Sequence, residues 1–341
     1  MRRTSIVLIF FSIFKFAHAQ ESATPIEDEI QIIFWNVENL FDTEDDSLKN
    51  DEEFLPYSMR GWNRDRYQKK LFSIYKTLVA TGQWKLPEVV ALAEIENEKV
   101  LQDLIERTPL IRSGYKIIHQ ESEDRRGIDL AILYKPDRLQ VIDTNFIKLN
   151  FPDDPYRKTR DIIYLKARVT EEHDFHLFVN HWPSRYGGGK ASEQGRNYAA
   201  FVVRAEIDSI LTYEPESSIV VTGDFNDTPE DQSLRILASD SILHIISDQD
   251  FSGTHKFQGL WSHFDHMWVS KSLMQSNTFY VKNRKAEIFH PDWLLEMDKA
   301  FGGVKPNRTY AGFRYHGGYS DHLPVFLELK VKPGILAEKE N

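Results

Sequence analysis

Four short strings of this sequence gather side chains that could bind a metal ion and carry protons. They are FWNVEN at residues 34–39, ALAEIE at 91–96, GDFND at 223–227 and SDHLPV at 320–325. Each places Asn, Asp, Glu or His beside an apolar run typical of a buried strand. Carboxylate and amide oxygens are hard ligands of the kind Mg²⁺ prefers, and carboxylates and imidazoles carry protons. The pattern favours one metal ion and one phosphate ester.

These side chains can act together only if the strands that carry them end at one rim. Four of them follow strand-like runs, namely Asn36, Glu94, His181 and Asp224. Ligands of open α/β sheets gather outside the carboxyl ends of strands, so these four are expected to lie close together. His322 precedes its strand and reaches the same rim if that strand runs antiparallel. Each residue alone could be an ordinary turn or packing residue, and it is the position shared by all that predicts a site.

Strands and helices alternate early in the sequence, and strands follow one another later. We expect strands at 30–37, 88–93, 115–119, 128–134, 161–170, 174–180, 218–222, 264–270 and 322–330, and helices at 65–80, 97–107, 192–213 and after Pro229. Residues 302–318 are rich in Gly, Pro and aromatic residues and are expected to form a long loop. The mixture predicts mixed sheets with outer helices. Without an internal repeat or linker, residues 30–332 are expected to form a single domain.

Composition excludes several classes of protein. The chain has 341 residues, a net charge of −10 and no cysteine. Disulfides and thiolate zinc sites are therefore excluded. An acidic protein has no general attraction for nucleic acid or anionic membranes, so any such binding must rest on local positive charge and a cation.

The amino terminus is typical of a secretory signal. Arg2 and Arg3 precede an apolar run from residue 6 to 14, and AHA at 17–19 is a small-x-small cleavage site. The alternative is a membrane anchor, but the run is too short to span a bilayer. We expect export to the periplasm or medium, no stable membrane association, a signal peptide at 1–19, a polar tether at 20–29 and a tail at 333–341.

Other catalytic and binding motifs fail on specific residues. The string that begins at Asp224 starts like a calcium loop, but Pro229 and Arg235 occupy the positions that need Gly and Glu. The glycines before Lys190 lack the Ser or Thr of a phosphate loop, because Ala191 follows. The sequence also contains neither a His-Glu-x-x-His helix nor a Gly-x-Ser-x-Gly elbow.

Taken in order, the motifs resemble those of the endonuclease/exonuclease/phosphatase superfamily, the deoxyribonuclease I-like fold. The strings GIDLA at 127–131, NHWPS at 180–184 and FDHM at 264–267 complete the set. The resemblance covers nearly all of the chain after its first residues. It implies an α/β fold, a four-layer sandwich of two packed mixed β-sheets flanked by helices. It also implies a divalent-metal-dependent phosphoester hydrolase.

The resemblance also implies roles for individual residues. Metal ligands would be Asn36, Glu94 and Asp321, with Mg²⁺ as the ion and Mn²⁺ as an alternative. Asp224, held by Asn226, would position or deprotonate water. His322, oriented by Asp265, would act as general acid or base. His181 would bind a phosphoryl oxygen or share that role, with Asp129 as its candidate orienting carboxylate.

The substrate is less constrained than the chemistry. The strongest candidates for local positive charge are Arg160, Arg185, Lys190 and Arg196. A phosphodiester, with nucleic acid as the leading class, is the first expectation. A phosphatase or phospholipase acting on sugar, inositol or lipid phosphates is the alternative. A non-catalytic binding module on the same fold is a third, and no protein partner is inferred.

Overall fold

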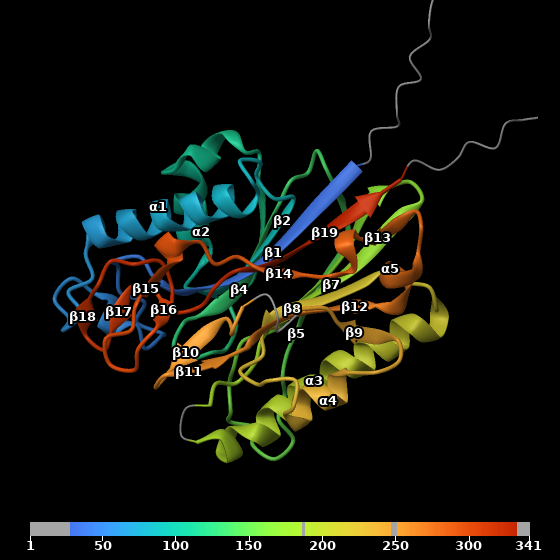
Figure 1. Ribbon diagram of the computed structural model, residues 1–341. Coiled ribbons are helices and arrows are strands. Elements are labelled where there is room, and N and C mark those ends of the chain that lie inside the picture. The colour runs from blue at the N-terminus through green and yellow to red at the C-terminus, as the bar shows by residue number, and fades with distance from the viewer. Residues whose placement is uncertain (1–27, 186–187, 247–250, 333–341) are drawn as a thin grey trace, which may run out of the picture.

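Two mixed β-sheets pack face to face, and helices cover the outer face of each, so the molecule has four layers (Figure 1). This computed structural model describes residues 28–185, 188–246 and 251–332. The expected sandwich is therefore confirmed. The expected signal segment, residues 20–27 of the tether and the tail at 333–341 lie outside the described residues.

The first sheet carries the amino-terminal half of the candidate site. Its strands follow the order β13-β19-β1-β2-β4-β3, with β14 beside β19. They are β1 (Asp28–Leu40), β2 (Val89–Ile95), β3 (Lys116–His119), β4 (Asp129–Tyr134), β13 (Phe279–Val281), β14 (Glu287–Ile288) and β19 (Val325–Val331). Strand β1 runs parallel to β2 and antiparallel to β19. The start of β19 therefore lies at the same rim as the ends of β1 and β2.

The second sheet repeats this arrangement. Its strands follow the order β5-β6-β7-β8-β12-β9. They are β5 (Gln140–Ile147), β6 (Ile162–Thr170), β7 (His173–His181), β8 (Ile219–Asp224), β9 (Ile242–His244) and β12 (Asp265–Ser270). Strands β7 and β8 are parallel, whereas β12 is antiparallel to β8 and pairs Asp265 directly with Asp224.

The helices begin and end where local signals place them. Helices α1 (Arg64–Thr81) and α2 (Glu98–Glu106) pack on the first sheet, and α3 (Gly189–Tyr213) and α4 (Gln232–Leu237) on the second, while α5 (Lys271–Gln275) follows β12 (Figure 1). The side chains of Asn63 and Asn97 cap α1 and α2 by accepting from the backbone N–H three residues on. Short 3₁₀ turns occur at Glu52–Phe54, Pro109–Arg112, Lys282–Arg284 and Asp292–Leu294.

The core explains why the strands read as continuous apolar runs. In β1 the side chains of Ile30, Ile32 and Phe34 enter the core between the two sheets, whereas Trp35 and Val37 pack outward under the helices. Successive side chains of a strand point to opposite faces, and here both faces are covered. A strand in this position is therefore apolar at most residues, and a buried polar residue such as Gln31 is hydrogen-bonded, here to Glu88 and Thr81.

Several short strands were not expected from the sequence. The edge strand β5 is largely exposed, so it lacks a regular apolar alternation. Three hairpins are β10–β11 (His255–Phe257 and Leu260–Ser262), β15–β16 (Leu295–Met297 and Val304–Pro306) and β17–β18 (Tyr310–Ala311 and Arg314–Tyr315). The segment 302–318, expected as a loop, thus contains β16, β17 and β18. Strands of two or three residues are too short to show a period of two.

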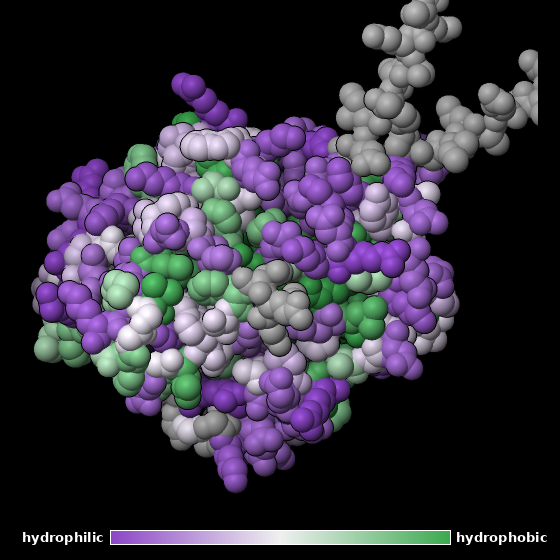
Figure 2. Space-filling model, viewed as in Figure 1, coloured by the Kyte–Doolittle hydropathy of each residue, from purple (hydrophilic) through white to green (hydrophobic). Residues whose placement is uncertain are grey.

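The surface is mostly polar in the view drawn. Figure 2 shows hydrophilic residues around the outline of this face and apolar residues gathered toward its middle. Within the described residues, no helix combines the length and apolar character needed to cross a membrane.

Candidate active site

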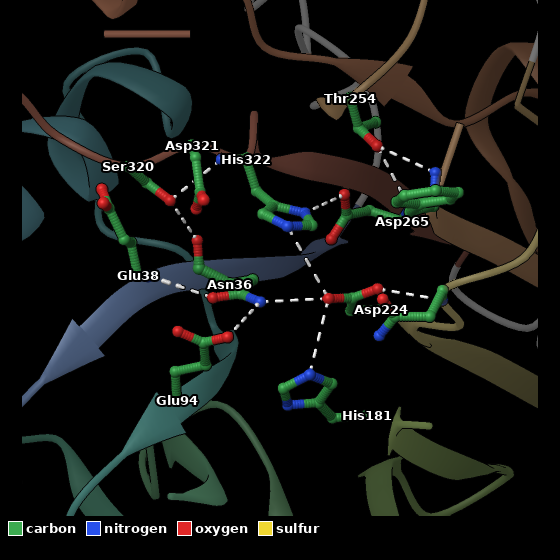
Figure 3. Close-up of polar contacts among 12 residues, drawn as sticks. Asn36, Glu38, Glu94, His181, Asp224, Thr254, Asp265, Ser320, Asp321 and His322 are labelled. Carbon is green, nitrogen blue, oxygen red and sulfur yellow. Dashed lines mark hydrogen bonds and ion pairs between the residues drawn. The ribbon is translucent and has the colours of Figure 1, made fainter. Parts of the chain in front are cut away.

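The residues singled out in the four strings converge on one rim where the two sheets meet (Figure 3). They come from β1, β2, β8 and the segment before β19, and β12 adds Asp265. Asp224 lies at the centre of the group, between Asn36, His181 and His322 (Figure 3). The antiparallel course of β19 brings His322 to this rim, as the sequence pattern required.

An irregularity in β1 and β2 aims the first two residues into the site. Asn36 pairs with Ala93, but the next paired residues are Leu40 and Ile95, so the residues after Asn36 lie opposite Glu94. Asn36 therefore lies within β1 and not at its end. Glu94 has a φ of 65°, a strained value for a residue with a side chain. Its Oε2 accepts a hydrogen bond from the backbone of Asn39 at 2.9 Å, which holds the side chain in the site.

Asp224 is the most connected carboxylate of the rim. Its Oδ2 accepts from Asn36 Nδ2 at 3.0 Å, and its Oδ1 accepts from the backbone of Asn226 at 3.0 Å. The Nε2 atoms of His181 and His322 lie 3.6 and 3.8 Å from Oδ2. Burial raises the pKa of Asp224 to about 7, with Asp265 adding to the rise. The carboxyl can therefore exchange a proton near neutral pH.

His322 is paired with Asp265. Its Nδ1 lies 2.7 Å from Asp265 Oδ2. Burial alone would lower the pKa of His322, but Asp265 and Asp224 outweigh it and hold that pKa well above the ordinary value. The two carboxylates therefore favour the protonated ring, whose Nε2 faces Asp224.

Backbone and hydroxyl contacts fix this pair in place. Ser320 Oγ donates to the backbone carbonyl of Asn36 at 2.7 Å and accepts from the backbone N–H of His322 at 3.0 Å. Trp35 Nε1 donates to the carbonyl of His322 at 2.9 Å. Thr254 Oγ1 accepts from the backbone N–H of Asp265 at 3.1 Å. Preorganised groups of this kind suit general acid–base chemistry.

The end of β8 needs a glycine, and the loop after it uses an asparagine. Gly223 has a φ of 155°, and a Cβ there would lie 2.2 Å from the carbonyl oxygen of Asn180. Strands β7 and β8 could not approach so closely with a larger residue. Asn226 donates from Nδ2 to the carbonyl of Trp182 at 3.1 Å, so it ties this loop to the residue after His181.

His181 is buried and neutral. Burial, followed by the charges of Arg160 and Arg126, holds its pKa well below the ordinary value. Its Nδ1 has no hydrogen-bond partner within the described chain. The structure corrects the expectation that Asp129 orients this ring. Asp129 instead accepts from the backbone of Ser122 at 3.0 Å, because the start of β4 turns its carboxylate toward that loop.

Two groups of residues have the chemistry to hold a metal ion. Ligand atoms of Asp224, Asp265 and His322 lie within 4.8 Å of one another. The second group is Glu94 with Asn36, whose Nδ2 faces Glu94 Oε1 at 3.2 Å. Asn36 Oδ1 accepts from the backbone of Glu38 at 3.0 Å, so the amide presents its donor to Glu94 and Asp224. A ligand role for Asn36 would need the amide to turn over.

Asp321 lies in a cluster that the sequence pattern only partly indicated. Arg308 donates from Nη2 to Asp321 Oδ2 at 2.8 Å, and its Nε lies 3.5 Å from Glu38 Oε1. Glu38 also accepts the backbone N–H groups of Thr309 and Tyr310 at 2.6 and 3.1 Å. Burial would raise the pKa of Asp321, but Arg308 and His322 lower it to about 2. Burial, with Asp321, raises the pKa of Glu38 to about 7.

A buried lysine of α1 holds the segment that carries this cluster. Lys70 Nζ donates to Thr309 Oγ1 and to the carbonyl of Tyr319, each at 2.6 Å. Burial lowers the pKa of Lys70 to about 8, although Glu38 opposes the shift. Lys70 and Glu38 were missed from the sequence, but both left a signal. Lys70 lies on the apolar face of α1 beside Leu71 and Ile74, and Glu38 shares a string with Asn36.

Three of the four predicted substrate-binding cations are paired with carboxylates of the protein, and two of the three are buried. Arg160 is buried and bonds Asp124 Oδ2 at 3.1 Å and the Trp182 carbonyl at 2.6 Å. Arg196 Nε lies 2.6 Å from Asp227 Oδ2, and Arg185 pairs with Asp227 at 2.7 Å and with Asp231. The expectation of direct substrate contact is thereby corrected for Arg160 and Arg196, because both are buried and paired with buried carboxylates. The side chain of Arg185 is 39% exposed, so its contact with substrate stays a prediction. Lys190 is exposed at the start of α3.

A wall of rings and cations stands beside Glu38 and Arg308. We call Tyr310, Phe313 and Tyr315, with Arg60 and Arg66, the aromatic wall. The Arg60 guanidinium lies 5.2 and 5.7 Å from the ring centres of Tyr310 and Phe313, and that of Arg66 lies 4.3 Å from Tyr315. Phe313 is 49% exposed. Arg60 also pairs with Glu53 on the surface, so its charge is partly neutralised.

Comparisons with known proteins agree with this geometry. A family model described as "Endonuclease/Exonuclease/phosphatase family" matches residues 31–331. A solved structure of a protein of that family from Bacteroides thetaiotaomicron is 17% identical, with a TM-score of 0.57, over 91% of this chain and 97% of its own. A mannosyl-6-phosphatase from Bacteroides thetaiotaomicron is 19% identical, with a TM-score of 0.56, over 88% and 99%.

A third solved structure is D. rerio TDP2 complexed with single strand DNA product. It is 15% identical, with a TM-score of 0.53, over 88% of this chain and 98% of its own. No curated protein sequence matches the chain. At these identities the solved structures establish a shared fold alone.

Proposed function

We infer the reaction from one premise: the chain belongs to the endonuclease/exonuclease/phosphatase family and is a metal-dependent hydrolase of phosphoric esters. We propose that its substrate is a phosphodiester, and that nucleic acid is the substrate class. The observation that carries the proposal is the aromatic wall, which is joined to the catalytic rim through Tyr310 and Glu38.

The metal ion we propose is Mg²⁺, with Mn²⁺ as a functional substitute, held chiefly by Glu94. A carboxylate with an amide beside it suits a hard cation that keeps several waters. When bound, the ion would supply charge stabilisation for the phosphoryl and leaving oxygens. The group of Asp224, Asp265 and His322 suits a cation less well, because the His322 imidazolium is positive and its Nδ1 is already bonded to Asp265.

The residues of the rim divide the proton transfers between them. Asp224 is fixed by Asn36 and Asn226 and accepts the proton of the attacking water. His322 carries a proton on Nε2 beside the same carboxylate and stabilises charge on a phosphoryl oxygen or returns a proton. His181 is neutral and donates a hydrogen bond to a non-bridging oxygen.

The aromatic wall supplies the substrate class. Base rings stack on aromatic side chains in a sequence-tolerant way, worth about 1–3 kcal/mol per base. Arginines above the rings add attraction for phosphate. With Arg160 and Arg196 buried and Arg185 paired with two carboxylates, this wall adds to the local positive charge that an acidic protein needs. Few phosphates would be neutralised, so the salt dependence of binding should be shallow.

The test is a substrate panel with a matched variant. Plasmid DNA, RNA, phosphorylated sugars and phospholipids are compared in one magnesium buffer, with His322→Ala as the contamination control. Phe313→Ala should raise KM for polynucleotide about fivefold or more. The same variant should leave KM for a small diester such as bis-p-nitrophenyl phosphate unchanged. If only a phosphomonoester or a lipid is hydrolysed, the nuclease proposal fails.

We also propose that the protein is exported. The support is the sequence of residues 1–19 alone, which lies outside the described residues. Amino-terminal sequencing of periplasmic or secreted protein should find Gln20 or a near neighbour. An uncut chain in the membrane fraction would overturn this proposal.

A further inference from the structure

Three carboxylates lie around Asn36, the residue that contacts Asp224 (Figure 3), and Mg²⁺ usually takes only one or two carboxylates from a protein. They are Glu38, Glu94 and Asp321. The chain itself supplies two cations to this cluster, Lys70 and Arg308. Each of the three carboxylates favours the charged form of both side chains by raising its pKa. The cluster therefore has positive charge before any metal ion enters.

Glu38 has little capacity left for a metal ion. One of its oxygens accepts the backbone N–H of Thr309 at 2.6 Å, and the other accepts that of Tyr310 at 3.1 Å. Arg308 Nε lies 3.5 Å from the second oxygen. A carboxylate offers about four lone-pair directions, and here a backbone donor occupies one on each oxygen while the Arg308 guanidinium lies against the second oxygen.

Asp321 is likewise engaged. Arg308 Nη2 donates to its Oδ2 at 2.8 Å, a charge-assisted hydrogen bond of the stronger kind. The guanidinium thus lies between Glu38 and Asp321 and neutralises charge that could otherwise attract a cation. Glu94 differs from both, because it accepts hydrogen bonds from the uncharged donors Asn36 Nδ2 and the Asn39 backbone.

Arg308 is held where it lies. The next residue, Thr309, is fixed by its backbone bond to Glu38 and by Lys70, which reaches it from α1. Lys70 also holds the carbonyl of Tyr319, at the far end of the same segment. Guanidinium remains charged at every accessible pH, so the positive charge at this point is permanent.

We propose that Arg308 takes the place of a second metal ion. Its guanidinium neutralises Glu38 and Asp321, leaves Glu94 as the carboxylate ligand of a single divalent ion, and directs its remaining N–H groups toward the phosphate. The inference rests on the proposed metal-dependent hydrolysis and adds the number of ions and a residue that limits it.

The test counts Mn²⁺ ions by calorimetric titration and by the free-ion signal in electron paramagnetic resonance. The wild-type protein should bind one ion per chain. Arg308→Gln should bind two, because Asp321 and Glu38 lose their cation, whereas Arg308→Lys keeps the charge and should bind one. Arg314→Gln is the matched control, an exposed arginine in the same segment, and should bind one. Two ions in the wild type, or one ion in folded Arg308→Gln, would overturn the proposal.

A second variant keeps the proposal testable if Arg308→Gln fails to fold. Asp321→Asn should change the Mn²⁺ affinity by less than about threefold, whereas Glu94→Gln should weaken it by at least about tenfold. Equal losses in the two variants would make Asp321 a ligand and refute the inference. Because ion counting needs no substrate, a protein that binds one ion but hydrolyses no diester would refute only the substrate proposal.

Discussion

The two ends of strands β7 and β8 present opposite kinds of polar surface. At the carboxyl end, His181 and Asp224 are paired across the strands and buried. At the other end lies a hollow of about 740 Å³, lined by Glu171, Glu172, Asp174, Glu214 and their neighbours. Most of these acids are exposed. The hollow has volume and negative charge, yet its ionisable groups are solvated and few are bonded to one another.

The difference shows that burial and mutual bonding locate the chemistry better than volume does. Each end has a buried histidine whose pKa is lowered first by burial, namely His181 and His176. His176 Nδ1 lies 2.8 Å from the hydroxyl of Tyr164 and has an ordinary structural partner. His181 instead faces Asp224 and has an unpaired Nδ1. Unsatisfied buried groups beside perturbed carboxylates are typical of functional sites.

The largest expected effect is the loss of activity when divalent ions are removed. It distinguishes the rim, which we expect to bind the ion, from the acidic hollow, which we expect not to. Exhaustive chelation should abolish hydrolysis, and added Mg²⁺ or Mn²⁺ should restore it. Glu94→Gln should shift the restoring concentration upward by at least about tenfold, since even indirect changes at metal sites cost about 10–100-fold. The double change Glu171→Gln with Glu172→Gln is the control and should leave the metal curve unchanged. Full activity after chelation would contradict the metal assignment.

The next effect sharpens the contrast between the histidines. Asp224→Asn and His322→Ala should each lower kcat by about 10²–10⁴-fold, the range for general acid–base groups. His176→Gln, at the far end of β7, should keep the wild-type rate. Circular dichroism should be used to check that all three variants are folded. Near-normal rates in both rim variants would mean that the site lies elsewhere.

A smaller loss of rate is expected when the His322 ring is kept and its partner Asp265 is changed. Asp265→Asn retains the His322 imidazole but removes the carboxylate that raises its pKa. Its rate should fall between those of wild type and His322→Ala, and the basic limb of the pH–rate profile should move to lower pH. A purely structural role for Asp265 would change the melting temperature and leave that limb in place.

The smallest effect concerns stability at the far end. The pKa of His176 is lowered from 6.5 to about 4, chiefly by burial. Below pH 6.5 the unfolded chain binds a proton that the folded protein does not, so this group costs stability as pH falls from 6.5 toward 4. His176→Gln should reduce the loss of unfolding free energy between pH 7 and pH 5 by about 2 kcal/mol. Urea unfolding at both pH values measures it, and parallel losses in the two proteins would argue against this account.

Local pattern determined much of this protein. Continuous apolar runs predicted the central strands, because a strand covered on both faces is apolar at most residues. Asn97 predicted the start of α2, and its side chain caps that helix. The polar residues at the ends of these runs predicted the rim, since strand direction alone carries Asn36, Glu94 and Asp224 to one side of the sheets.

Only the tertiary structure decided how charges pair around that rim. Glu38 and Thr309 are 271 residues apart in sequence yet share a hydrogen bond, and Arg308 meets Asp321 only because their segment folds back on itself. The same holds for Arg160, Arg185 and Arg196, whose carboxylate partners lie in other elements. A short stretch of sequence determines the local backbone direction and burial, because these depend on residues that are close in sequence. The partner of a charged side chain depends on distant segments, so the sequence indicated which residues reach the site and the fold decided which charges remain there for a substrate.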